Sequence, residues 1–149
     1  MLPSRRWQVK VFFFMVFAAP PLWAQAEEPD PASYIGMSIA ELLDRFGTPR
    51  SVYALRGLEE WQDDVVFVYN AGDFYILKDR VWQVRLNSAY RIRSGDQNAV
   101  VYLSLGDAAF NGKDFAVFSL KGKNWPMSLR CNFDSAGKIT AIFIYRSDI

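Results

Sequence analysis

The sequence predicts an α+β fold in which two units, each a helix followed by an antiparallel sheet, form one curved sheet with the helices on one face. Three observations lead to this prediction: one helix with clear caps, strand-like runs separated by short turns, and a glycine spacing in the first half that recurs in the second. We expect a single domain over residues 34–146, with repeats at 34–90 and 91–146.

The first 26 residues have the three parts of a cleavable secretory signal peptide. Arg5, Arg6 and Lys10 precede an apolar run over 11–23, and Ala24-Gln25-Ala26 matches the small-residue pattern that a signal peptidase accepts. The apolar run is shorter than the ~20 residues of helix that a bilayer requires. We therefore predict cleavage after Ala26, no transmembrane span after cleavage, and a periplasmic or secreted protein. The general secretory and twin-arginine routes both stay open.

Residues 27–33 are acidic and contain proline, so we expect a short flexible leader. A helix is predicted over 38–46, because Ile39, Leu42, Leu43 and Phe46 recur at the spacing of one helical face. Ser38 with Glu41 forms a capping box, and Gly47 supplies the end of the helix.

Strands are predicted at 51–55, 61–69, 73–78 and 81–86, which are rich in β-branched and aromatic residues. The turns at 70–72 and 79–80 are short enough to require antiparallel hairpins. These four strands should therefore form a meander.

The second half repeats this organisation. Gly95 and Gly106 are eleven positions apart, as are Gly36 and Gly47, and strand-like runs follow at 115–120, 127–133 and 139–146. We expect a second helix between Gly95 and Gly106, with Gly95-Asp96 as its N-cap. The β-branched residues in this segment leave a strand as the alternative.

Composition excludes several classes of function. Removal of 26 residues takes away three of the 17 basic residues and none of the 16 acidic ones, so the mature net charge is about −2, which disfavours nucleic-acid binding. The chain has no histidine, which removes the commonest proton shuttle and metal ligand. Its single cysteine, Cys131, cannot form an internal disulfide, and we expect it to be a small buried apolar residue. We predict no cofactor, no metal and no catalysis.

One acidic group could contradict that prediction. Glu59, Glu60, Asp63 and Asp64 lie close together before and inside the second strand, and paired carboxylates can act as a general acid and base. A small-ligand carrier or an enzyme that uses this group is therefore the alternative function. The simpler interpretation is a solvated loop.

Aromatic content indicates how the protein could bind a partner. With helices on one face of the sheet, strand alternation leaves part of the aromatic side chains on the other face, interleaved with arginine. Such a surface is typical of protein–protein interfaces. The six candidate partner-binding residues are Tyr53, Trp61, Tyr69, Tyr75, Arg85 and Trp125. Coverage of both faces, with every aromatic residue in the core, is the alternative.

Gly36-Met37-Ser38 followed by Gly47-Thr48-Pro49 and a strand-rich stretch resembles the signature of the SmpA/OmlA (BamE) outer-membrane assembly proteins. The tandem form resembles the β-lactamase inhibitor protein architecture over residues 34–146, in which two helix-plus-sheet units present a concave sheet to a protein. This resemblance implies protein recognition without catalysis. The assembly proteins carry a lipid-anchored N-terminal cysteine that this chain lacks. We therefore expect a non-catalytic protein-binding module of the cell envelope, whose partner is an unidentified envelope or extracellular protein.

Overall fold

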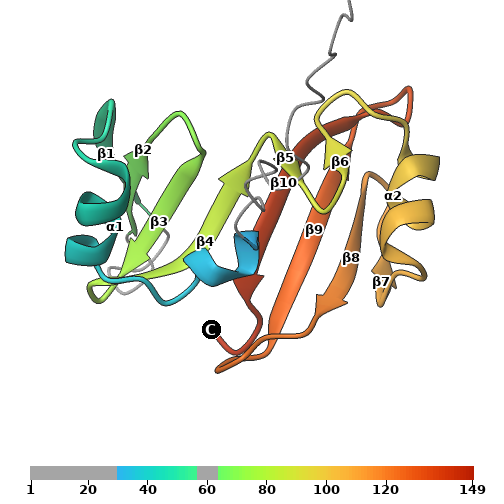
Figure 1. Cartoon of the computed structure of the whole chain (residues 1–149). Helices are drawn as coiled ribbons and strands as arrows, with labels where there is room; N and C mark the ends of the chain where they lie inside the picture. Colours follow the sequence, from blue (N-terminus) through green and yellow to red (C-terminus); the bar gives the residue numbers. More distant parts are fainter. Residues whose placement is uncertain (1–29, 57–63) are drawn as a thin grey trace, which may run out of the picture.

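The computed structural model describes residues 30–56 and 64–149. Within them, the chain has an α+β fold built on an eight-stranded antiparallel sheet (Figure 1). The strand order is β1-β2-β3-β4-β10-β9-β8-β7, so the two halves of the chain meet where β4 pairs with β10. The strands of this sheet are β1 (Ser51–Leu55), β2 (Asp64–Val68), β3 (Asp73–Leu77), β4 (Arg80–Leu86), β7 (Phe110–Asn111), β8 (Phe115–Leu120), β9 (Met127–Phe133) and β10 (Ile139–Arg146).

The predicted strands agree closely with the observed ones. The runs at 51–55, 115–120, 127–133 and 139–146 have the predicted bounds, and those at 73–78 and 81–86 differ by one residue at one end. The run at 61–69 is observed as β2, with its first three residues outside the described part of the chain. Three two-residue strands, β5 (Ser88–Ala89), β6 (Ile92–Arg93) and β7, were too short to leave a pattern in the sequence.

Helix α1 (Ile39–Phe46) forms where the sequence predicts it. The Ser38 hydroxyl accepts a hydrogen bond from the backbone N–H of Glu41. The Glu41 carboxylate accepts one from the backbone N–H of Ser38 at 2.7 Å, which completes the capping box. Hydrogen bonds from the backbone and side chain of Ser38 hold the pKa of Glu41 below its usual value. Gly47 ends the helix with φ of 73°.

Helix α2 (Asn98–Leu105) forms in the segment where a helix was predicted and a strand was the alternative. Its N-cap residue is Gln97, which makes no side-chain capping bond, so the predicted cap at Gly95-Asp96 is wrong. The Asp96 carboxylate instead accepts the amide of Arg93 at 2.8 Å. Gly106 ends the helix as predicted, with φ of 81°. No helix in the described residues is long and apolar enough to cross a membrane.

Both helices pack on the same face of the sheet. Phe46 of α1 lies 5.2 Å from Phe74 between ring centroids, and Tyr102 of α2 lies 5.7 Å from Phe118. Phe74 and Phe118 belong to one cross-strand row: Val52, Phe67, Phe74, Val84, Ile144, Leu129 and Phe118. Because paired residues in a sheet share a face, this row defines the helix face, and the opposite side is the open face. Figure 1 shows the β5–β6 hairpin and the 3₁₀ helix η1 (Pro31–Tyr34) between the two helices.

An aromatic cluster forms the core beneath α1. The rings of Tyr34, Phe46, Tyr69 and Phe74 contact one another, with centroid distances of 5.2 to 5.6 Å. Tyr69 is only 7% exposed, and its hydroxyl donates to the Gly47 carbonyl at 3.1 Å. Its predicted place on the open face is therefore wrong. Tyr69 follows Phe67 by two positions, so strand alternation carries both side chains to the helix face.

The end of the predicted flexible leader enters the 3₁₀ helix η1. Asp30 caps η1 by accepting the amide of Ala32 at 3.0 Å, and it accepts the hydroxyl of Tyr90 at 2.7 Å. Residues 30–33 of the predicted leader thus make hydrogen bonds in and beside η1, while 27–29 lie outside the described residues. Tyr34 is buried in the core, and this anchor fixes the residues that precede it.

Strand β4 contains a bulge that changes which way its side chains face. The register with β3 shifts between Tyr75 and Ile76, which makes Trp82 an additional residue in β4. Strict alternation predicts Trp82 and Val84 on one face and Val81 on the other. Instead Val81 and Val84 are both fully buried in the core, and Trp82 lies on the open face.

Equivalent backbone hydrogen bonds precede the two helices. The Gly36 amide donates to the Val81 carbonyl at 2.8 Å, and the Gly95 amide donates to the Ile139 carbonyl at 2.8 Å. Both glycines have positive φ, 89° and 93°, and α1 and α2 each have eight residues. The start of each helix is therefore tied to the strand that lies next to the centre of the sheet.

Candidate functional site

The open face of the sheet is lined by two long cross-strand rows. Register places Tyr53, Val66, Tyr75, Gln83, Tyr145, Ser128 and Ser119 in the first row. It places Ser51, Val68, Asp73, Arg85, Phe143, Arg130, Val117 and Phe110 in the second row. Aromatic rings and arginines thus alternate with small and polar side chains, a composition that protein interfaces favour.

Tyrosine rings partly close the β1–β3 end of this face. Val66 pairs with Tyr53 on one side and with Tyr75 on the other, and it is fully buried. Tyr75 itself is 9% exposed, and burial raises the pKa of its hydroxyl, with smaller contributions from Tyr53 and Asp73. Tyr53 is 44% exposed and is the tyrosine of this group that a partner can reach.

Two cross-strand polar contacts order the same end. The indole Nε1 of Trp82 donates to Oδ1 of the buried Asp64 at 3.0 Å. Arg85 lies directly opposite Asp73 in the register, and its Nη1 is 3.5 Å from the Asp73 carboxylate. Both contacts match a charged or polar group on one strand with its neighbour on another. The Arg85–Asp73 contact pairs two opposite charges, whereas the Trp82 indole is neutral and gives Asp64 only a hydrogen-bond donor.

A hollow of about 420 Å³ lies in the middle of the open face, over β4, β10 and β9. It is lined by Trp82, Gln83, Arg130, Asn132, Phe143, Tyr145, Arg146 and Ile149. Three aromatic residues, two residues with side-chain amides and two arginines therefore line one concave surface. A ligand there can pack against the rings and be oriented by the polar groups.

Arg130 is held in place within this hollow. Its guanidinium carbon lies 4.0 Å from the centroid of the Phe115 ring, a cation–π distance. Its Nε donates to Asn132 Oδ1 at 2.7 Å. The ring and the amide fix the plane of the guanidinium, so its terminal nitrogens can meet a planar acceptor without a large loss of side-chain entropy.

The charge of Arg130 is not balanced by a neighbour. Arg146 makes two hydrogen bonds to Asp148, at 2.9 and 3.0 Å, and Arg85 pairs with Asp73. Across residues 30–56 and 64–149, no carboxylate forms an ion pair with Arg130. Arg130 therefore contributes an unpaired positive charge to the hollow, which favours an anionic group.

The predicted partner-binding residues divide between the two sides of the sheet. Tyr53, Tyr75 and Arg85 lie on the open face, as register shows, whereas Tyr69 lies in the core. Trp61 lies outside the described residues.

Trp125 lies on the helix face of the sheet, so its expected place on the open face is wrong. This residue stands in the β8–β9 loop, and a Cβ built on Gly36 would lie 2.3 Å from its indole ring. The guanidinium of Arg146 lies 4.9 Å from the ring centroid. A loop residue has no strand alternation to indicate its facing, so the sequence held no signal for this placement.

Sequence reasoning did not select Arg130, Phe143 or Tyr145 as site residues. Alternation along β10 puts Phe143 and Tyr145 on one face of the sheet. Arg130 and Asn132 are two positions apart in β9, so alternation puts these two side chains on one face as well. That signal was present in the sequence. The pairing of β10 with β4 and β9 decides which face is open, and it depends on tertiary structure.

The acidic group Glu59, Glu60, Asp63 and Asp64 is represented in the described residues by Asp64 alone; the other three lie outside them. Asp64 is 9% exposed and bonded to Trp82, so the expectation of a solvated side chain is wrong at this position. No group of three or more His, Cys, Asp or Glu residues suited to a metal occurs in the described residues.

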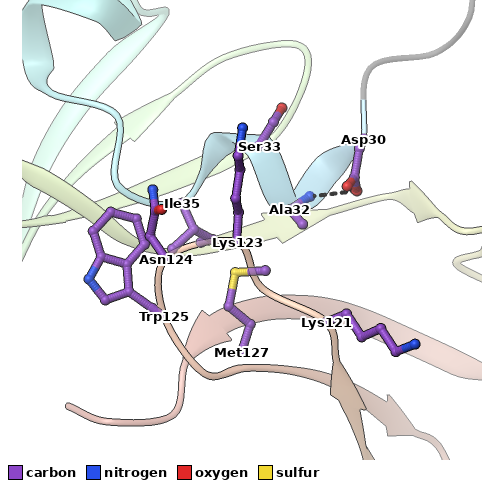
Figure 2. A pocket seen from close by; sticks show the side chains of 9 residues that line it. All are labelled: Asp30, Ala32, Ser33, Ile35, Lys121, Lys123, Asn124, Trp125 and Met127. Carbon is purple, nitrogen blue, oxygen red and sulfur yellow. Dashed lines mark hydrogen bonds between the residues drawn. The ribbon is translucent and has the colours of Figure 1, made fainter.

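A second hollow, of about 320 Å³, lies on the helix side between η1 and the β8–β9 loop (Figure 2). Ile35, Trp125 and Met127 form its apolar wall, and Lys121 points away from the other side chains. Asp30 lies at its rim together with Lys123, so the charges there are mixed. This hollow lacks the converging polar groups that the hollow around Arg130 provides.

Cys131 is fully buried on the helix face, opposite Ile142 and Ala116 in the register. Burial raises the pKa of its thiol to about 12. The thiol is therefore protonated at neutral pH and is a packing group, not a nucleophile.

No protein-family model matches the chain, and no curated protein matches it. A solved structure that it resembles is an extracellular protein containing an SCP domain from Bacillus anthracis strain Ames, with a TM-score of 0.53 and 12% sequence identity. The match covers 99% of this chain and 51% of the other, so the chain spans about half the length of that protein. At this identity the likeness shows the fold alone. The resemblance to the SmpA/OmlA and β-lactamase inhibitor proteins stays a prediction.

Proposed function

We propose that this chain is an exported, non-catalytic binding module that recognises a protein of the cell envelope or extracellular space through the open face of its sheet. The observation that carries the proposal is Arg130: a fixed guanidinium with unbalanced charge in a hollow with three aromatic rings. Arginine and aromatic anchors of this kind contribute much of the binding free energy in protein interfaces.

The chemistry of the hollow indicates which group of the partner would enter it. A guanidinium presents parallel N–H groups that match the two oxygens of a carboxylate. The neighbouring Phe143 and Tyr145 rings offer apolar surface beside that charge. We therefore expect an acidic side chain of the partner to bind Arg130, with adjacent apolar residues packed on the rings.

Two further observations support the proposal. The N-terminal 26 residues have the composition of a secretory signal, which supports a location outside the cytoplasm. The equivalent hydrogen bonds of Gly36 and Gly95 and the equal helix lengths support two tandem repeats that share one sheet. Joined repeats give a sheet wide enough to accommodate a protein partner.

Site-specific photocrosslinking in intact cells can test this proposal. A photoreactive amino acid replaces Ser119, an exposed residue of the open face, or Leu103, which is 86% exposed on α2. Mass spectrometry identifies the products, and the captured protein is then purified and its affinity is measured. The proposal predicts that one protein is captured from Ser119 and not from Leu103.

The decisive variant is Arg130→Ala, with Arg45→Ala as its matched control. The guanidinium carbon of Arg45 also lies over aromatic rings, 4.9 Å from the ring centroid of Tyr34 and 5.5 Å from that of Phe46. Arg45, however, is in α1, on the other side of the sheet. Arg130→Ala should weaken binding about 30-fold, the effect of losing roughly 2 kcal/mol at an interface anchor. Arg45→Ala should change the affinity less than twofold. Equal effects of the two variants, with both proteins still folded, would refute the open face as the binding site.

The second candidate function is a carrier of a small anionic molecule. The hollow volume of about 420 Å³ lies within the range of small-ligand sites, roughly 300–1,000 Å³. The carrier function predicts that an anionic molecule copurifies with the unmodified protein and does not copurify with the Arg130→Ala variant. Native mass spectrometry of both proteins after export distinguishes this function from protein recognition.

A further inference from the structure

Strand β1 forms one edge of the eight-stranded sheet and is exposed along its length. All five of its residues are exposed, with Val52 at 52% and Leu55 at 48%. Among the described strands it pairs with β2 alone. One side of β1 therefore presents backbone N–H and C=O groups that an additional strand can pair with.

The features that normally prevent such pairing are missing from β1. Its sequence, Ser-Val-Tyr-Ala-Leu, has no charge and no proline, and its register with β2 runs from Ser51 to Leu55 without a bulge. The opposite edge strand, β7, has only two residues. Val52 stands on the helix face and Tyr53 on the open face, so an added strand finds apolar contacts on both sides.

The charges at the ends of β1 indicate what can pair with it. Arg50 and Arg56 immediately flank the strand, and both are exposed. If two copies of the chain paired antiparallel through the full length of β1, Arg50 of one copy would stand opposite Arg56 of the other at both ends. Like charges directly opposite each other destabilise a strand pair. A strand with carboxylates at its two ends would instead be attracted.

We infer that β1 is a strand-addition site for an extended segment of a protein partner, with five residues that alternate between the faces and an acidic residue at each end. Backbone hydrogen bonds hold the segment, and its apolar side chains pack beside Val52 on one face and Tyr53 on the other. Its carboxylates lie against Arg50 and Arg56. This site lies at the β1 edge, whereas the hollow around Arg130 lies over the central strands β4, β10 and β9, and the inference stands independently of the proposed function.

A peptide titration tests the inference on the protein purified after export. One probe is a seven-residue peptide with aspartate at both ends and the core Val-Tyr-Val-Thr-Val, and the control probe has the same core with lysine at both ends. Backbone amide exchange is followed by NMR. The aspartate peptide should slow exchange in residues 51–55 and should bind at least roughly tenfold more tightly than the lysine peptide at low salt.

Charge reversal at the end of the strand provides the second measurement. Arg56→Glu should weaken the aspartate peptide roughly three- to tenfold and strengthen the lysine peptide, because one exposed ion pair becomes a repulsion. Arg91→Glu, at an exposed arginine in the β5–β6 turn, is the matched control and should change neither affinity.

Four results would overturn the inference. The first is failure of the aspartate peptide to bind at millimolar concentration, and the second is binding without slower exchange in residues 51–55. The third is equal affinity for both peptides in the unmodified protein. The fourth is protection of residues 51–55 that rises with protein concentration in the absence of peptide, because the occupant of the edge would then be a second copy of the chain.

Discussion

Gly36 and Gly95 have nearly the same backbone conformation but different surroundings, and this difference gives a sharp prediction. Their φ values are +89° and +93°. A Cβ added at Gly36 would lie 2.3 Å from two ring carbons of Trp125, whereas one added at Gly95 would meet no atom within 4 Å. Gly36→Ala should therefore destabilise the protein more than Gly95→Ala does.

The magnitude follows from two separate effects. Both substitutions place a side chain at positive φ, which costs about 1–3 kcal/mol of folding free energy in each case. Gly36→Ala must also move the Trp125 ring, and crowding of this kind costs about 1–3 kcal/mol more. The two variants should thus differ by about 1–3 kcal/mol in their free energies of unfolding.

Urea unfolding of four variants provides the assay. Besides Gly36→Ala and Gly95→Ala, each glycine substitution is made in a Trp125→Ala background. Removal of the indole removes the crowding, so the two glycine substitutions should then have equal costs to within about 0.5 kcal/mol.

Equal costs in the unmodified protein would refute the packing of Trp125 against Gly36. An excess cost of Gly36→Ala that persists without the indole would refute the proposed cause. Either result would reopen Trp125 as a partner-binding residue, because its indole would then not be engaged in this contact.

Three further predictions concern caps and titrating groups. Ser38→Ala should lower the free energy of unfolding by about 1 kcal/mol, whereas Gln97→Ala, which loses no capping bond, should change it little; thermal melting compares the two. With the pKa of Cys131 raised by burial from 9.0 to about 12, a disulfide reagent at pH 8 should label the native thiol about 1,000-fold more slowly than the urea-unfolded thiol, and comparable rates would contradict its burial. Burial and the hydrogen bond to Asp30 raise the pKa of Tyr90 above its ordinary value of 10.0. The stability contributed by the neutral phenol is therefore fully present below pH 10.0 and is lost as the pH rises above that value. The melting temperature should decline in this range, and Tyr90→Phe should make the decline smaller.

The candidate site was only partly predictable. The sequence indicated a face with aromatic residues and arginine, and Tyr53, Tyr75 and Arg85 lie on it. It did not indicate that Tyr75 is nearly buried or that Arg130 is the arginine whose charge remains unbalanced. Charge balance depends on cross-strand pairs such as Asp73 with Arg85, and these pairs form between residues that are distant along the chain.

The sequence alone determined the helix at Ile39–Phe46, the termination of both helices by glycine, and most strand bounds. These features depend on hydrogen bonds and backbone preferences within a few residues, which a local pattern records. Tertiary structure decided the facing of Trp82, Tyr69 and Trp125 and the assembly of the hollow around Arg130. A bulge, a strand register and a loop packed against a distant glycine set those positions, because each arises from contacts between parts of the chain that are far apart in sequence.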